Sequence, residues 1–109
     1  MNYISVDEFK KLDLRVGRII EVKDHPNASK LYILTVDLGY EKRQIVSGIK
    51  EWYKPEDLIG KSIIVITNLE PKNIRGIESQ GMLLAAEDEN RNLSLIVPER
   101  EVKVGAKVY

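Results

Sequence analysis

The chain has 109 residues, which is enough for one hydrophobic core and too short for a second. Seventeen basic and seventeen acidic side chains give a formal net charge of zero, which argues against a protein that binds phosphate over its whole surface. No apolar run approaches the length needed to cross a bilayer. We therefore expect a single domain over residues 1–109 with no membrane partner.

The chain has no cysteine, and its first residues lack the basic and apolar regions of a signal peptide. Disulfides, thiolate nucleophiles and sulfur-ligated metals are thereby excluded. A cytoplasmic location is the simplest interpretation.

The charges are segregated along the chain. Residues 61–75 hold three cations against one carboxylate, Glu70, whereas residues 87–101 hold five carboxylates against two arginines. The sequence therefore contains one basic and one acidic region.

The first predicted element is a short helix that begins after Ser5. Ser5 and Glu8 fit a capping box, in which each side chain satisfies a free backbone amide of the other residue. From Leu14 the apolar residues follow a β pattern, and we expect a bend at Gly17, because glycine inside a strand marks a bulge or tight curve. The predicted strands cover residues 14–22, 30–38, 43–47, 62–67, 82–86, 93–97 and 102–108.

Residues 55–60 begin with proline and end with glycine, a pattern that predicts a helix of one or two turns. Ile63 to Ile66 form a continuous β-branched run that predicts a buried strand. Residues 68–81 contain one proline and two glycines and are predicted to be irregular. Short strands with two minor helices favour an all-β barrel or sandwich.

The sequence offers little catalytic chemistry. His25 is the only histidine, so a zinc site would have to be built almost entirely from carboxylates, which zinc disfavours. We expect this histidine, which lies in a His-Pro turn, to be a structural or a surface residue. No glycine-rich phosphate loop is present. We expect no catalytic residue, no metal and no cofactor, and we interpret the acidic stretch over residues 87–89 as a solvated turn.

Two polar segments, residues 25–32 and 68–82, are rich in hydrogen-bonding side chains. The second combines cations, amides, a serine and glycines, which can donate to phosphates and base edges. This composition makes it a candidate RNA-binding loop. The alternative is a solvated connection.

Four motifs in these and neighbouring segments resemble the successive signatures of the tRNA-binding domain family. They occur in order over nearly the whole chain, and their agreement is more specific than any one motif. The motifs are Asp13-Leu14-Arg15-Val16-Gly17, His25-Pro26-Asn27-Ala28-Ser29-Lys30-Leu31-Tyr32, Arg43-Gln44-Ile45-Val46-Ser47-Gly48-Ile49 and Asn73-Ile74-Arg75-Gly76-Ile77-Glu78-Ser79-Gln80-Gly81-Met82.

The resemblance implies a five-stranded Greek-key OB barrel with short helices and extra C-terminal strands, whose concave face receives tRNA. It also implies a homodimer and an association with methionyl-tRNA synthetase, for which the chain would be a non-catalytic β subunit or tail. Carried over residue by residue, it places RNA contacts at Lys30, Arg43, Asn68, Lys72, Arg75, Ser79 and Met82.

Alternatives remain for several of these residues. Lys30 and Lys72 fit ordinary surface lysines, Met82 fits the core, and Arg43 could pair with Glu41. The chain also departs from the family at Glu70, where lysine is common, and at Ile74, where methionine is frequent. Glu70 removes one phosphate contact and adds repulsion, so tRNA binding should be weak and salt-dependent.

Two functions follow. The first is structure-specific tRNA binding by a dimer. Its two faces each bind RNA weakly, and together they contact more phosphates than either face alone. The alternative is a small dimeric export chaperone of the same fold, which would require an exposed apolar groove for unfolded polypeptide. The cationic motifs favour tRNA.

Overall fold

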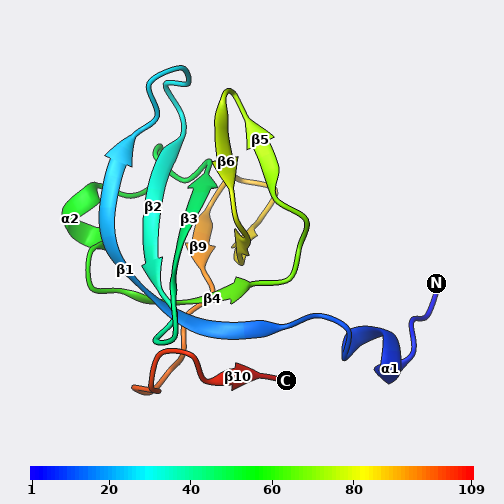
Figure 1. Ribbon diagram of the computed structural model, residues 1–109. Helices are drawn as coiled ribbons and strands as arrows, with labels where there is room; N and C mark the ends of the chain where they lie inside the picture. The colour runs from blue at the N-terminus through cyan, green and yellow to red at the C-terminus, as the bar shows by residue number, and fades with distance from the viewer.

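In the computed structural model, strand β1 (Leu14–Asp24) is the longest element and lies at the centre of the main sheet (Figure 1). It pairs antiparallel with β2 (Tyr32–Asp37) on one side and with β4 (Ser62–Ile66) on the other. Strand β3 (Lys42–Ser47) extends the sheet beyond β2, and β7 (Met82–Leu83) extends it beyond β4. The resulting order is β3-β2-β1-β4-β7.

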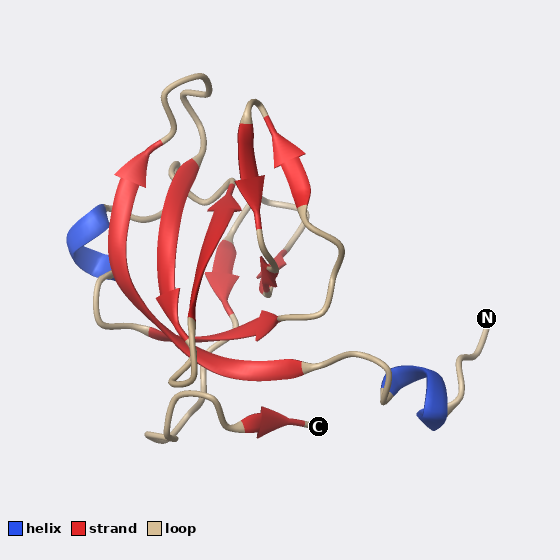
Figure 2. Cartoon of the chain, in the orientation of Figure 1, coloured by secondary structure: helices blue, strands red, loops and turns tan.

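The structure describes residues 1–109, and strands dominate it (Figure 2). Strand β5 pairs with β6, β8 pairs with β9, and β10 pairs with the start of β1. No helix is long and apolar enough to traverse a membrane. The remaining elements are α1 (Val6–Phe9), α2 (Pro55–Leu58), β5 (Lys72–Ile74), β6 (Ile77–Ser79), β8 (Ala85–Glu87), β9 (Leu93–Leu95) and β10 (Lys107–Val108).

The sheet closes into a nearly complete barrel where β3 meets the segment that leads into β7. The backbone N–H of Gln80 donates to the carbonyl of Gln44 at 2.7 Å. Gly81 has φ +145°, and a Cβ there would lie 3.0 Å from the Ile66 carbonyl oxygen, so glycine is needed at this approach. The strands follow the order β1-β2-β3-β7-β4 around the barrel, which confirms the predicted all-β, OB-type fold.

Gly17 permits a close approach between strands. Pairing between β1 and β4 continues through Gly17, and a Cβ there would lie 2.5 Å from Cγ1 of Val36. The bulge in β1 lies three residues later, at Ile20, where the register with β2 shifts. The sequence therefore predicted the strand, and the bulge follows the glycine at which a bend was expected.

The predicted irregular segment over residues 68–81 contains the β5–β6 hairpin instead. Ile74 is opposite Ile77, so Arg75 and Gly76 form a two-residue turn with φ values of +56° and +95°. Positive φ at both central residues is the requirement of a type I′ hairpin turn. Glycine here permits the hairpin, and the interpretation of Gly76 as a strand breaker was wrong.

The C-terminal part of the barrel is more broken than predicted. Leu84 separates β7 from β8, and its N–H donates to Ile64 while its carbonyl accepts from Ile96. In the predicted strand over residues 102–108, Gly105 turns the chain with φ +88°, so only Lys107 and Val108 remain in a strand. The capping box of α1 is present as predicted, and that helix buries none of its residues.

The core occupies the barrel interior, and a smaller apolar cluster lies on the other face of β1 and β4. Ile63 and Val65 point into the main core, whereas Ile64 and Ile66 pack in the second cluster. Strand β4 is therefore buried on both faces, which confirms the prediction from its β-branched run. The β5–β6 hairpin contacts strand β3 of this barrel.

Candidate nucleic-acid interface

His25 connects the loop between β1 and β2 to the β5–β6 hairpin. Its Nδ1 accepts the N–H of Asn27 at 3.0 Å, so the ring proton resides on Nε2, which donates to the Ile74 carbonyl at 2.9 Å. The side chain is only 5% exposed. The single histidine is thus a structural link, one of the two roles expected for it from the sequence.

Arg75 lies at the tip of the hairpin and is held there by its backbone. Asn27 Nδ2 donates to the Arg75 carbonyl, and Arg75 Nη2 donates to the Asn27 carbonyl, both at 3.1 Å. Arg75 takes part in no ion pair and is exposed. Its guanidinium therefore has N–H groups free for an anionic ligand.

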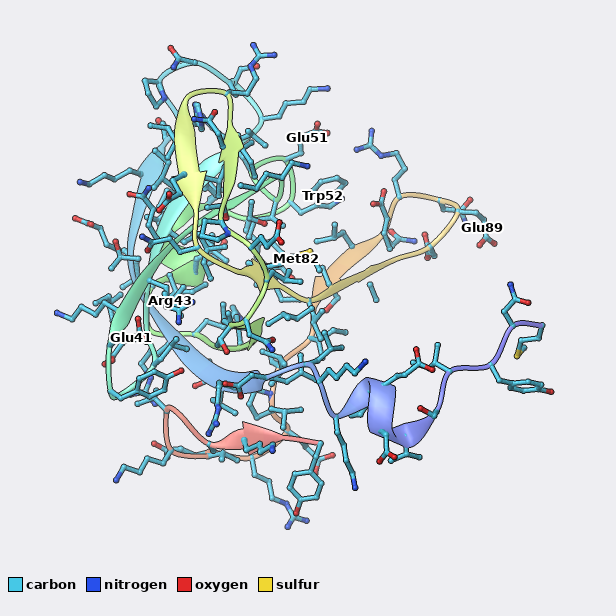
Figure 3. All side chains as sticks on the ribbon, turned by 45° about the vertical axis from the view of Figure 1, so that its right-hand side comes forward. Glu41, Arg43, Glu51, Trp52, Met82 and Glu89 are labelled. Carbon is cyan, nitrogen blue, oxygen red and sulfur yellow. The ribbon has the colours of Figure 1, made fainter.

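A groove of about 620 Å³ separates the hairpin from the barrel. Met82 lines it and is 47% exposed, so this side chain is not part of the core (Figure 3). Lys72 and Glu70 line the same groove, and Lys72 is exposed and forms no ion pair. Its other lining residues are Val46, Ser47, Gly48, Leu69, Ile74, Ser79 and Gly81.

A second hollow, of about 330 Å³, brings Lys30 and Arg75 together. Lys30 lies in the loop two residues before β2, rather than at the start of that strand as expected. Its Nζ is 3.4 Å from Oε1 of Glu51. Four of the predicted residues therefore line two cavities beside the β5–β6 hairpin: Lys72 and Met82 the groove, and Lys30 and Arg75 the hollow.

Arg43 is turned toward the protein instead. It donates to Glu41 through Nε at 2.8 Å and Nη2 at 3.3 Å, while Nη1 donates to the carbonyls of Thr67 and Gln80 at 2.8 and 3.0 Å (Figure 3). The hydrogen bond from Arg43 lowers the pKa of the Glu41 carboxyl. The pairing with Glu41 is thus present, and Arg43 braces the junction between β3 and the segments after β4 and β6.

Asn68 and Ser79 also bond to backbone. Asn68 Oδ1 accepts the N–H of Asp13 at 2.7 Å, and its Nδ2 donates to the Lys11 carbonyl. Ser79 is 4% exposed, accepts the N–H of Val46 and donates to the Gly81 carbonyl, each at 3.0 Å. The structure therefore buries Ser79 beside the groove, whereas Asn68 is exposed outside the groove lining and joins the segment after β4 to the segment before β1.

Three residues beside the hollow were not predicted as a cluster. Trp52 Nε1 donates to the Arg91 carbonyl at 2.9 Å, and the Arg91 guanidinium lies 5.0 Å from the Trp52 ring centroid. Nη2 of Arg91 is 3.4 Å from Oε2 of Glu51. The sequence held no signal that would bring residues 51 and 91 together. No group of acidic and histidine side chains in the structure could hold a metal ion.

Comparison of this chain with known proteins identifies its family. Residues 14–107 match the family described as "Putative tRNA binding domain". The chain belongs to the tRNA-binding domain family. The match includes every segment that lines the groove and the hollow.

The relatives include methionine–tRNA ligases of archaea. The ligase of Pyrococcus horikoshii is 62% identical over 108 residues, which are 99% of this chain and 15% of the ligase. That of Methanocaldococcus jannaschii is 54% identical over 99% of this chain and 17% of the ligase. The chain thus corresponds to a small module of these enzymes, a tRNA-binding domain, which confirms the prediction of a non-catalytic unit.

Solved structures share the fold over the whole chain. A MetRS-related protein from Pyrococcus horikoshii superimposes with a TM-score of 0.93 at 44% identity, covering 100% of both chains. The chaperone CsaA from Bacillus anthracis gives 0.89 at 29% identity, covering 99% of this chain and 100% of that one. Both functions weighed from the sequence therefore have structural neighbours.

Proposed function

We propose that this chain is a non-catalytic module that binds folded tRNA through the groove and the adjoining hollow. The observation that carries the proposal is that Lys72 lines the groove, whose lining also includes apolar side chains, while Lys30 and Arg75 line the hollow at the tip of the same hairpin. Cations from separate loops fit a folded RNA backbone, because phosphate contacts dominate affinity and depend on shape rather than sequence.

The groove itself suits an unstacked base. Met82, Leu69 and Ile74 offer apolar surface to a base face. Gly48 leaves its surroundings open, since a Cβ there would meet only Leu31 at 3.5 Å. The backbone of a nucleotide can therefore approach closely while its phosphates reach the cations.

The predicted residues divide into two roles. Lys30, Lys72, Arg75 and Met82 contact RNA in this proposal. Arg43, Asn68 and Ser79 hold the groove in shape through backbone hydrogen bonds, and Arg43 retains one N–H for a phosphate.

We further propose that the module acts as a cytoplasmic homodimer. Apolar side chains stand exposed at the two chain ends, with Tyr3, Ile4 and Val6 each at least 67% exposed and Tyr109 at 98%. A hollow of about 270 Å³ lies between them, lined in part by Phe9 and Val108. Covering this surface with a second copy would place two RNA faces in one particle.

The proposed partner is methionyl-tRNA synthetase. The module would raise the local tRNA concentration of that enzyme, either within one polypeptide or as a β subunit. Such coupling increases affinity by effective concentration and requires no new contact to the catalytic site.

The test of the RNA face is substitution of Arg75. Arg75→Glu should weaken binding to folded tRNA by at least about tenfold, since it replaces a charge-assisted contact with repulsion. Arg75→Asn, which tolerates the left-handed backbone at this turn, should give an intermediate loss with the hairpin intact. Affinity is measured by titration into fluorescent tRNA.

The control is Arg100→Glu, which makes the same charge change in the segment before β10, at the opposite end of the barrel from the hairpin tip (Figure 1). It should leave affinity within about twofold of the original. Equal effects of Arg75→Glu and Arg100→Glu would exclude the hairpin from the binding site.

The second candidate function is binding of unfolded polypeptide. The apolar side chains in the groove and the likeness to CsaA favour it. Polypeptide binding of that kind would be insensitive to Arg75→Glu and to salt, whereas tRNA binding should weaken with Arg75→Glu and with rising salt concentration.

A further inference from the structure

Lys30 and Arg91, which come from loops far apart in the sequence, meet at one carboxylate. Oε1 of Glu51 is 3.4 Å from Lys30 Nζ, and Oε2 is 3.4 Å from Arg91 Nη2. Glu51 and Trp52 lie beside the β5–β6 hairpin, on the side that faces the β8–β9 hairpin (Figure 3). A single anionic group thus bridges two cations at the edge of the hollow that contains Arg75.

Arg91 is held in place before any ligand arrives. Its backbone adopts φ +64°, and its carbonyl accepts the Trp52 indole N–H at 2.9 Å. The guanidinium lies over the Trp52 ring, and Nε is 3.6 Å from Oε2 of Glu87. These contacts position the Nη2 edge toward Glu51.

The bridge formed by Glu51 is weak enough to be displaced. Both distances are long for ion pairs, and the side chains of Lys30 and Arg91 are 74% and 62% exposed. Exposed pairs of this kind contribute little net free energy and are screened by salt. A phosphodiester could replace the carboxylate at small cost.

We propose that Lys30 and Arg91 form a phosphate subsite for RNA, and that Glu51 occupies this subsite in the free protein as an internal competitor. The subsite extends the cationic path from Arg75 through Lys30 to Arg91. The inference rests on the proposed tRNA-binding function, and it assigns a binding role to Arg91 and an opposing role to Glu51.

The decisive variant is Glu51→Gln, which keeps the shape of the side chain and removes its charge. Binding to folded tRNA should become about three- to tenfold tighter, the scale of two exposed ion pairs. The gain should shrink as salt rises, because the ion pairs of the original protein are then already screened. The charge-matched control is Glu56→Gln on α2, where the carboxylate forms no ion pair.

Arg91→Asn tests the cation, since asparagine tolerates the positive φ at this turn. It should weaken tRNA binding and largely remove the gain from Glu51→Gln in the double variant. Trp52 is the only tryptophan, so its emission reports the environment of Arg91, and the change on adding tRNA should shrink in Arg91→Asn. Thermal unfolding of each variant shows that the fold persists.

The outcomes are separable. If the original protein binds tRNA and loses affinity with Arg75→Glu, but Glu51→Gln behaves like Glu56→Gln, the subsite is overturned and the proposed function stands. A gain from Glu51→Gln that persists without Arg91 also overturns the subsite. Absence of any salt-sensitive tRNA binding by the original protein overturns both.

Discussion

His25, Asn27 and Arg75 form a small set of reciprocal contacts on which the position of the β5–β6 hairpin depends. The histidine satisfies one backbone donor and one backbone acceptor, and the asparagine and arginine exchange hydrogen bonds with each other's carbonyls. The hairpin has only three residues in each strand, too few to be stable alone in water. This loop therefore holds the tip of the hairpin, while the end of β6 is bonded to β3 through Glu78, Ser79 and Gln80.

His25→Ala should release the hairpin without opening the barrel. Two partly buried backbone groups lose their partner, which costs about 1 kcal/mol or more in the free energy of unfolding. Amide hydrogen exchange followed by NMR should accelerate at Gly76 and Ile77 and remain slow in β1 and β4. Unchanged exchange at Gly76 and Ile77 would show that the hairpin is held by other contacts.

Glu70 opposes RNA in the same groove that Lys72 lines. Glu70→Lys should tighten tRNA binding severalfold and make the logarithm of the affinity fall more steeply with the logarithm of salt concentration, by about one phosphate contact. Glu56→Lys on α2 serves as the control for net charge. If both variants gain equally, the effect is long-range and the groove is not the site.

At the residue scale, four of the seven predicted RNA-contact residues lie exposed at the groove or the hollow, and the sequence did not indicate which four. Lys30, Lys72, Arg75 and Met82 reach the solvent-facing surface, whereas Asn68 and Ser79 face backbone groups. A family motif contains both kinds of residue, because some of them hold the loop in its conformation and others face the solvent. Only the path of the backbone distinguishes them.

Among the elements, the junction braced by Arg43 depends on the charge of Glu41. The pKa of Glu41 lies below its usual value of 4.5 because Arg43 donates hydrogen bonds to the charged form. A folded-state pKa below that of the unfolded chain stabilises the fold above the unfolded value, and this contribution is lost as pH falls through the folded value.

The original protein should therefore lose stability as pH falls below about 4.5, and Glu41→Gln should show a shallower loss over the same range. Urea denaturation at a series of pH values measures both profiles. Parallel profiles would mean that protonation of Glu41 does not act on the fold. Asp13 and Asp88, whose pKa values are also lowered, contribute to the remaining slope.

The long strands and both short helices were predicted from the sequence, whereas the short β5–β6 hairpin was not. Strands β1 to β4 carry clear apolar patterns and were placed within two residues at most boundaries. The β5–β6 hairpin was missed because its turn has arginine at the first left-handed position, where asparagine or glycine is usual. The bulge at Ile20 was missed because no residue around it is typical of a bulge. The prediction was placed at Gly17, three residues earlier, because glycine often marks such a site.

For the whole molecule, the proposed dimer explains how a chain of zero net charge could bind RNA. Phe9→Asp places a charge in the apolar hollow at the chain ends and should yield a monomer by light scattering. Its tRNA affinity should fall by about a hundredfold through the loss of avidity. Ile59→Asp, at another exposed apolar position after α2, should change neither property.

A monomer with full affinity would separate RNA binding from dimerisation, and a persistent dimer would place the contact elsewhere.

The fold class followed from short apolar strands and could be predicted from physics and pattern, whereas tRNA as the ligand came from the motifs of the family. Composition alone identifies neither the RNA nor its partner enzyme.

The most direct measurement is titration of the protein with folded tRNA, with unfolded RNA of the same length and with an unfolded polypeptide, each at several salt concentrations. We predict tightest binding to folded tRNA, weakening steadily as salt rises and impaired by Arg75→Glu. Equal binding of folded and unfolded RNA, or salt-insensitive preference for the polypeptide, would contradict the assignment of the groove to tRNA.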